Sequence, residues 1–151
     1  MAVLVDTGIL LRLLDRTDPQ HALIRQAVRL LRSRGNRLVT SPQNAAEFWN
    51  VSTRPSTARG GLGLTVHEAE RRLRMLERLF PILPDSPSTY PHWRQLVIGL
   101  GVVGVQVHDA RLVAFMMAHS LAQLLTLNPA DFVRYPGITA VTPASLLGTS
   151  P

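Results

Sequence analysis

Four of the chain's ten acidic residues stand in apolar or small-residue surroundings, where an unpaired carboxylate is unfavourable. These acids are Asp6, Glu47, Asp109 and Asp131. Asp6 and Asp131 come just beyond predicted strands, and Asp109 stands at the start of the most apolar predicted helix. Glu47 lies on the apolar side of its own predicted helix. A structural role is open to each acid taken alone, since Asp6 also suits the N-cap of the helix that follows it.

Acids that gather in this way predict a site for a hard divalent cation. In a parallel sheet the strand tips and the helix starts after them share one edge, so the four acids can meet there. Like charges are unfavourable together unless a cation neutralises them or one takes up a proton. The chain has no cysteine and only scattered histidines, and oxygen ligands alone favour Mg²⁺ or Mn²⁺. Two such ions roughly 4 Å apart support water attack on a phosphodiester without a nucleophilic side chain.

The basic residues indicate a polyanionic partner. All sixteen are arginines, and the net charge is +6. Arginine binds phosphate oxygens through a planar, two-pronged donor group, so this charge is consistent with nucleic-acid binding beside a metal site. The Gly- and Pro-rich segment 53–64 carries Arg54 and Arg59, which are the candidates for contact with substrate phosphates.

Length and patterning predict one globular α/β domain. The 151 residues are 46% hydrophobic and 17% charged, which is enough to bury a single core. Short apolar strands alternate with helical segments, and this alternation favours a parallel sheet flanked by helices. No leader segment and no apolar run of roughly 18 residues is present, so a cytoplasmic protein that avoids membranes is expected. The predicted strands are 2–5, 37–40, 80–83, 121–125 and 138–141; the predicted helices are 9–14, 21–34, 42–51, 65–79, 89–101 and 110–119; a proline-broken tail follows.

Four segments resemble the PIN-domain ribonucleases, and more closely the VapC toxins of bacterial type II toxin–antitoxin pairs. The segments are Val3–Thr7, Ser41–Phe48, Val107–Ala110 with Ala114 and Ala118, and Leu125–Phe132. Each is short, but the four occur in family order at family-like intervals over nearly the whole chain. The resemblance implies a PIN-like three-layer α/β/α sandwich with a short, mainly parallel central sheet. The expected organisation is a single domain over residues 1–147 with a tail over 148–151.

The resemblance also implies roles for the acids. Asp6 and Asp109 are expected to bind the metal directly, and Glu47 directly or through water. At the fourth position some members carry Asp where this chain has Asn128, while many have Asn there and Asp three residues later. We therefore expect Asp131 to complete the site with Asn128 in support; the alternative is that Asp131 only caps the turn before Phe132.

Three further polar residues are expected to support the carboxylates. Thr7 and Thr126 are expected to orient ligands or water, although both also suit turns. Asn44 lies one helical turn before Glu47 on the same side of the helix, so it is expected to position that carboxylate.

The implied function is a Mg²⁺- or Mn²⁺-dependent endoribonuclease that hydrolyses RNA phosphodiester bonds. As a toxin it would form homodimers, bind a cognate antitoxin protein and cut tRNA or another structured RNA. Two alternatives are a stand-alone PIN nuclease of RNA processing and a catalytically inactive nucleic-acid-binding module. A phosphatase-like hydrolase is disfavoured because the sequence has neither an Asp-x-Asp pair nor a phosphate-binding Gly loop.

Overall fold

The computed structural model describes residues 1–149, which form four β-strands, seven α-helices and two short 3₁₀ turns. The strands are β1 (Ala2–Val5), β2 (Arg37–Val39), β3 (Gln123–Leu125) and β4 (Thr139–Val141). The helices are α1 (Thr7–Leu13), α2 (His21–Ser33), α3 (Pro42–Thr53), α4 (Val66–Leu79), α5 (Thr89–Gly99), α6 (Val107–Ala118) and α7 (Pro143–Leu147), and the 3₁₀ turns are η1 (Gly104–Gln106) and η2 (Pro129–Phe132). Of the predicted tail, residues 150–151 lie outside the described part of the chain.

The four strands form one parallel sheet in the order β2-β1-β3-β4. The first strand is central because its apolar residues can be buried on both faces. Val3 and Val5 belong to one hydrophobic core, whereas Leu4 belongs to the other, and all three are fully buried. The sheet is therefore covered on both sides, which confirms the predicted three-layer α/β/α fold with a short parallel sheet.

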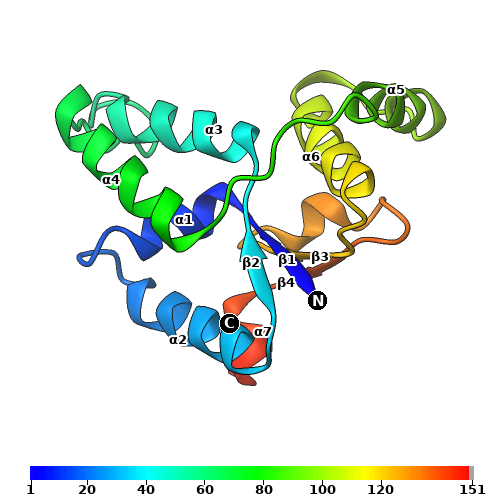
Figure 1. Ribbon diagram of the computed structural model, residues 1–151. Coiled ribbons are helices and arrows are strands. Elements are labelled where there is room, and N and C mark those ends of the chain that lie inside the picture. Colours follow the sequence, from blue (N-terminus) through cyan, green and yellow to red (C-terminus); the bar gives the residue numbers. More distant parts are fainter. Residues whose placement is uncertain (150–151) are drawn as a thin grey trace.

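Each face of the sheet is covered by its own set of helices (Figure 1). On one face, α1, α2, α3, α4 and α7 supply the apolar side chains of the first core, for example Ile24 and Phe48. On the other face, α6 contributes more buried residues to the second core than any other element, and α5 packs outside it. The loops that leave the carboxyl ends of β1 and β3 run between these layers, so side chains placed there can face helices from both sides.

Local capping signals start two helices where the sequence predicts. The Ser41 side chain accepts a hydrogen bond from the backbone N–H of Asn44 at 3.1 Å, and Pro42 follows as the first residue of α3. At α4, Thr65 and Glu68 form a reciprocal capping box with bonds of 3.2 and 2.8 Å. Such caps satisfy backbone donors that would otherwise be left open, and at α3 the cap also sets the position of Glu47.

Two predicted elements are wrong. Residues 80–83 do not form a strand; they make only an isolated bridge between Ile82 and Thr40, because Pro81 has no N–H to give to a ladder. The segment after β4 is not an irregular tail but α7, which Thr142 caps through a 3.0 Å bond from the backbone N–H of Ser145. Thr142–Pro143 is the same cap-and-proline signal that begins α3, and Leu146 then packs against the first core.

The most apolar helix, α6, starts three residues earlier than predicted, at Val107 instead of 110. Its first turn therefore contains Asp109, which is held inside the helix at the edge of the sheet. Phe115 and Met116 are buried in the second core, whereas Met117 is 40% exposed. Over residues 1–149, none of the helices combines the length and the apolar character needed to cross a membrane.

Candidate metal centre

Asp6 sits at the carboxyl end of β1 and is also the N-cap of α1, so both roles considered for it are compatible. Its Oδ1 accepts a hydrogen bond from the backbone N–H of Thr7 at 2.8 Å and one from Asn44 Nδ2 at 3.3 Å. Its Oδ2 accepts a bond from the hydroxyl of Thr126 at 2.7 Å. Because Thr126 follows β3 and Asn44 belongs to α3, the carboxylate is fixed by three separate parts of the chain.

Glu47 joins the same network through Thr7. The Thr7 hydroxyl donates to Glu47 Oε2 at 2.7 Å and accepts from Asn44 Nδ2 at 3.0 Å. Ser41 in turn donates to the amide oxygen of Asn44 at 2.6 Å, so the donors run in one direction from the buried Ser41 to the carboxylate. Asn44 thus reaches Glu47 through Thr7, whereas the sequence had suggested a direct contact along the helix.

Asp109 and Asp131 approach the site from the other layer and from the loop after β3. Asp109 is half-buried in the first turn of α6, and Asp131 is an exposed residue of η2. The backbone N–H of Asn128 donates to the Thr126 hydroxyl at 3.1 Å, while the Asn128 carbonyl accepts from the backbone N–H of Asp131 at 3.2 Å. The loop that carries Asp131 is therefore tied by its backbone to the threonine that holds Asp6.

The carboxylates influence one another electrostatically. Burial raises the pKa of Asp6, and the charges of Glu47 and Asp131 raise it further, although hydrogen bonds from Thr126 and Thr7 act in the opposite direction. Burial, followed by the charges of Asp131, Asp6 and Glu47, raises the pKa of Asp109 to about 6. The charges of the other acids therefore reach Asp6 and Asp109, and ionising these two together with their neighbours is unfavourable.

This donor set fits a hard divalent cation. Its members are carboxylate oxygens from four elements, and their mutual repulsion is relieved when positive charge is added. Within residues 1–149 no three acidic or histidine side chains are already close enough to form a complete ligand group. Charges influence one another over about 10 Å. The carboxylates can therefore shift one another's pKa values without being close enough to form a complete set of metal ligands. Asp6, Glu47, Asp109 and Asp131 are the residues that would hold Mg²⁺ or Mn²⁺.

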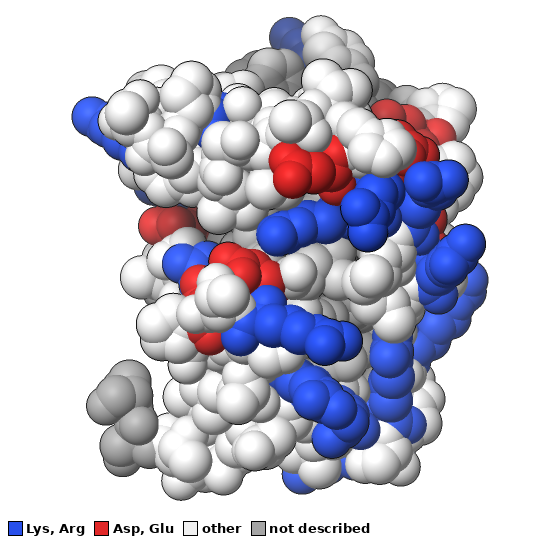
Figure 2. Space-filling model, turned by 90° about the vertical axis from the view of Figure 1, so that its left-hand side faces the viewer, with Lys and Arg blue, Asp and Glu red and all other residues white. Residues whose placement is uncertain are grey.

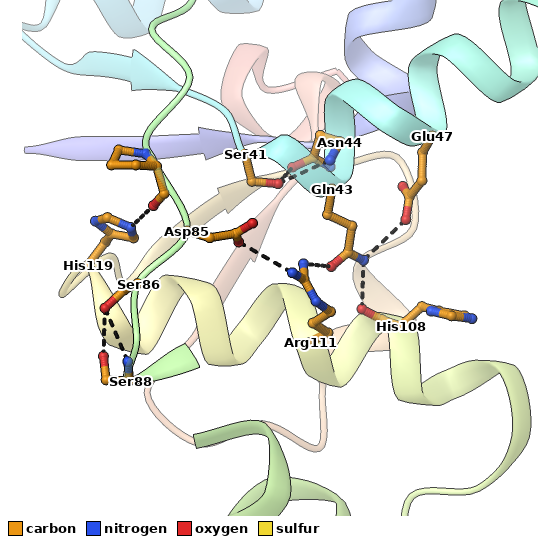
Figure 3. A network of polar contacts seen from close by, with 11 residues as sticks. Ser41, Gln43, Asn44, Glu47, Asp85, Ser86, Ser88, His108, Arg111 and His119 are labelled. Atoms are coloured by element: carbon orange, nitrogen blue, oxygen red, sulfur yellow. Dashed lines mark hydrogen bonds and ion pairs between the residues drawn. The ribbon is translucent and has the colours of Figure 1, made fainter. Parts of the chain in front are cut away.

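A second network, absent from the sequence predictions, links the two layers beside Glu47 (Figure 3). The side-chain amide of Gln43 donates to Glu47 Oε1 at 3.1 Å and to the backbone carbonyl of His108 at 2.9 Å. Arg111 donates to Gln43 Oε1 at 3.0 Å and pairs with Asp85 at 3.3 Å. Gln43 thereby joins α3, which carries Glu47, to the start of α6, which carries Asp109. The four-residue spacing of Gln43 and Glu47 on one helix was the only sequence signal for it.

A comparison with known families identifies the fold. The PIN domain family matches residues 3–138, which is most of the chain. The chain belongs to the PIN domain family. The resemblance predicted from the four acidic segments is confirmed at this level. Among curated proteins the chain has no significant sequence match.

Solved structures share the PIN fold of this chain. A toxin–antitoxin complex from Klebsiella pneumoniae is 25% identical, with a TM-score of 0.63 over 93% of this chain and 97% of that chain. VapBC-1 from nontypeable Haemophilus influenzae has a TM-score of 0.68 at 17% identity, over 95% and 99%. VapC20 from Mycobacterium tuberculosis, described as a Sarcin-Ricin loop cleaving toxin, has a TM-score of 0.55 at 18% identity, over 81% and 86%.

Arg54 and Arg59 lie at the far end of α3 from the PIN-domain acids. Seven residues separate Arg54 from Glu47, which is roughly 10 Å of helix. The Arg54 guanidinium donates to the backbone carbonyl of Arg59 at 2.7 Å and so braces its own loop. Arg59 is exposed and lines a cavity of about 350 Å³ with Arg12 and Asp18. Their predicted contact with substrate phosphates stays a prediction.

Arginines also gather on the outside of α2 and α4. Figure 2 shows this side of the molecule, where basic side chains run across much of the surface. The exposed arginines of the two helices are Arg25, Arg29, Arg32, Arg71, Arg74 and Arg78. Only the pair Arg74–Glu70, at 3.0 Å, is an ion pair among them in the described residues, so most of this positive charge is available to a polyanion.

Proposed function

We propose that this PIN domain is a Mg²⁺- or Mn²⁺-dependent endoribonuclease and the toxin of a toxin–antitoxin pair. The observation that supports this most strongly is that acids distant in sequence act on one another: the charges of Glu47 and Asp131 affect Asp6, and those of Asp6, Glu47 and Asp131 affect Asp109. Burial and mutual repulsion raise the pKa values of both Asp6 and Asp109, so the site has negative charge that a cation would stabilise. The VapC-type complexes that share the fold support the toxin role.

The chain's own residues would orient the ligands and the substrate. Thr126 and Asn44 hold Asp6, while Thr7 and Gln43 hold the two oxygens of Glu47. A divalent cation held by these carboxylates would offset charge on the phosphate and lower the pKa of a water molecule, whose hydroxide form could then attack phosphorus. Because the supporting donors are already in place, little reorganisation of Asp6 and Glu47 is needed when the substrate arrives.

Basic charge on the surface of the molecule supports RNA as the substrate. The net charge is +6 although four acids are concentrated in one site, and the arginines of α2 and α4 form a broad positive surface (Figure 2). Phosphate contacts of this kind supply affinity without sequence preference. A folded RNA such as tRNA presents closely spaced phosphates to such a surface, and we propose this class of target in the cytoplasm.

Exposed apolar residues support association with other chains. On the second face, Ile98, Val103 and Val105 are 64%, 72% and 82% exposed. Apolar side chains that cluster on a surface are common at protein interfaces. We propose that this region serves a homodimer and that a cognate antitoxin binds elsewhere and covers the acidic site.

The test is cleavage of labelled total RNA by the purified protein with Mg²⁺ or Mn²⁺ and with chelator. The parent is expected to give discrete products only with metal, and Asp6→Asn and Asp109→Asn to lose them. Glu77→Gln removes an exposed acid of α4 and serves as the matched control, which should cut like the parent.

Three other results of this cleavage test would favour a different explanation. Equal cleavage by both site variants would trace the activity to a contaminant. RNA binding without cleavage, and without dependence on metal, would favour the inactive binding module. Cleavage by the parent without any toxicity in cells would favour the stand-alone nuclease of RNA processing.

A further inference from the structure

A cavity of about 380 Å³ lies beside the acidic site, between the start of α5 and the outer side of α6. Its lining residues are Asp85, Ser86, Thr89, Tyr90, Trp93 and Arg111. The volume falls in the range of sites that hold small organic molecules. None of the six is among the acids or supporting residues described above as the metal centre, although Arg111 connects the two regions.

One wall of this cavity is aromatic. Tyr90 and Trp93 stack with ring centroids 6.0 Å apart and planes inclined by 30°. The Trp93 indole N–H donates to the backbone carbonyl of Val107 at 3.0 Å, which fixes its ring. Tyr90 is 65% exposed and is supported from behind by Trp93. An exposed ring held in this way is a suitable surface for stacking with a planar group.

A buried hydroxyl among the lining residues has no partner. Thr89 is only 5% exposed, and its hydroxyl makes no hydrogen bond to any atom of residues 1–149. Its neighbours do not compete for it, because the hydroxyls of Ser86 and Ser88 bond to each other at 2.9 Å. Buried hydroxyls are rarely left unsatisfied, but the Thr89 oxygen is itself shielded, so the groups open to a bound molecule are those of Tyr90, Asp85 and Arg111.

The charged lining connects the cavity to the metal centre. Arg111 and Asp85 form an exposed ion pair at 3.3 Å, which leaves donor and acceptor capacity on both. The other prong of Arg111 bonds to Gln43, and Gln43 bonds to Glu47, so only two hydrogen bonds separate the cavity from a proposed metal ligand (Figure 3). A molecule in the cavity would therefore be linked to Glu47 through Arg111 and Gln43.

We propose that this cavity binds one unpaired nucleobase of the RNA, adjacent to the bond that is cut. This inference rests on the proposed nuclease function. The base stacks on Tyr90, its polar edge meets Asp85, and Arg111 donates to a base carbonyl or to the neighbouring phosphate. A stacking surface bordered by both donors and acceptors suits a planar heterocycle better than an apolar peptide side chain. Recognition of unstacked bases by aromatic rings is typical of sequence-dependent RNA binding.

The test measures binding separately from cleavage. In an Asp6→Asn background, which prevents cutting, fluorescence anisotropy gives the affinity for labelled oligo(A), oligo(C), oligo(G) and oligo(U). Tyr90→Ala is expected to weaken the best of these by about fivefold or more, and Tyr90→Phe to retain its affinity. Gln95→Ala alters an exposed residue of the same helix outside the cavity and should bind like the parent.

A second arm locates the base. Removing single bases from the preferred oligonucleotide should weaken binding at one position only, and that effect should vanish in Tyr90→Ala. Parent-like affinity of Tyr90→Ala for every oligonucleotide would overturn the inference even if the parent is an active nuclease. Tyr90-dependent binding by a parent that never cuts RNA would instead support the cavity and overturn the nuclease, so the two failures are distinguishable.

Discussion

The two halves of the acidic site are built in different ways. In the first half, Asp6 and Glu47 are held by hydroxyl and amide donors from α1, α3 and the loop after β3, with bonds of 2.7–3.3 Å. In the second half, Asp109 lies in α6 and Asp131 in η2. The main sign of their interaction with the other acids is the pKa of Asp109, which is raised to about 6.

This difference indicates that the two halves have different roles in binding a metal ion. The first half has its geometry in place before a ligand arrives, because buried Asn44 and Thr126 have no freedom to turn away. In the second half the carboxylates repel the other acids, and a bound cation would reduce this repulsion. If this is correct, substitutions of supporting residues should damage the first half most, whereas neutralising an acid of the second half should stabilise the metal-free protein.

The largest effect is expected from Thr126→Val. This substitution keeps the shape of a fully buried side chain but removes its bonds to Asp6 Oδ2 and to the backbone N–H of Asn128. Loss of such an outer partner lowers metal affinity or activity by roughly 10–100-fold. RNA cleavage as a function of Mn²⁺ concentration measures both quantities.

Thr139→Val is the matched control for this threonine, since Thr139 is exposed on the edge strand β4. It should behave like the parent. Parent-like cleavage by Thr126→Val as well would mean that the first half does not depend on its hydrogen bonds.

A smaller effect is expected from Gln43→Leu. Glu47 loses one donor but keeps the 2.7 Å bond from Thr7, and the connection between α3 and α6 is broken. A net hydrogen bond contributes about 0.5–1.5 kcal/mol, so the rate should fall by about two- to tenfold. Single-turnover cleavage measures this fall, with Gln95→Leu, an exposed glutamine of α5, as the control. A loss as large as that of Thr126→Val would remove the distinction between the two networks.

The smallest effect concerns stability. The pKa of Asp109 is raised from 3.8 to about 6 in the folded protein, so between these values the folded state binds more protons than the unfolded state. Metal-free protein should therefore lose stability as the pH rises from 4 through 6. Because Asp109 is partly exposed, solvent screens its charge, and we expect the free energy of unfolding to fall by about 1 kcal/mol. This corresponds to a decrease of about 2–4 °C in Tm.

Asp109→Asn should remove this pH dependence and raise the Tm at pH 7 in chelator. Thermal unfolding of parent and variant across this pH range is the measurement. A lower Tm for the variant at neutral pH would show that the charged carboxylate is stabilised by contacts other than those described.

Much of the fold could be predicted because its signals are local. The apolar run of β1 marks a buried central strand, and the caps at Ser41 and Thr65 place the helix starts. For Asp6 alone an N-cap is a sufficient explanation, and the prediction of a site depends on the three further acids in similarly apolar or small-residue settings. Local signals were misleading at residues 80–83, where the apolar residues predict a strand but Pro81 lacks the N–H that a strand needs. At Thr142 the cap-and-proline signal does mark a helix, α7, where a tail was predicted.

The second network was beyond prediction from one sequence. Gln43 and Arg111 are polar residues separated by 68 positions, and only the tertiary fold brings their side chains within 3.0 Å of each other. The cavity beside them depends in addition on where α5 begins. Such contacts arise from tertiary structure and leave no spacing pattern in the chain.

Titration calorimetry of Mn²⁺ into the purified protein tests the central claim most directly, because it requires neither a known RNA nor a known antitoxin. The account predicts saturable binding by the parent and by Glu77→Gln, strongly weakened in Asp6→Asn and in Asp109→Asn, which lie on opposite halves of the site. Undiminished binding by both folded site variants would contradict the account, since the metal would then be held by other residues.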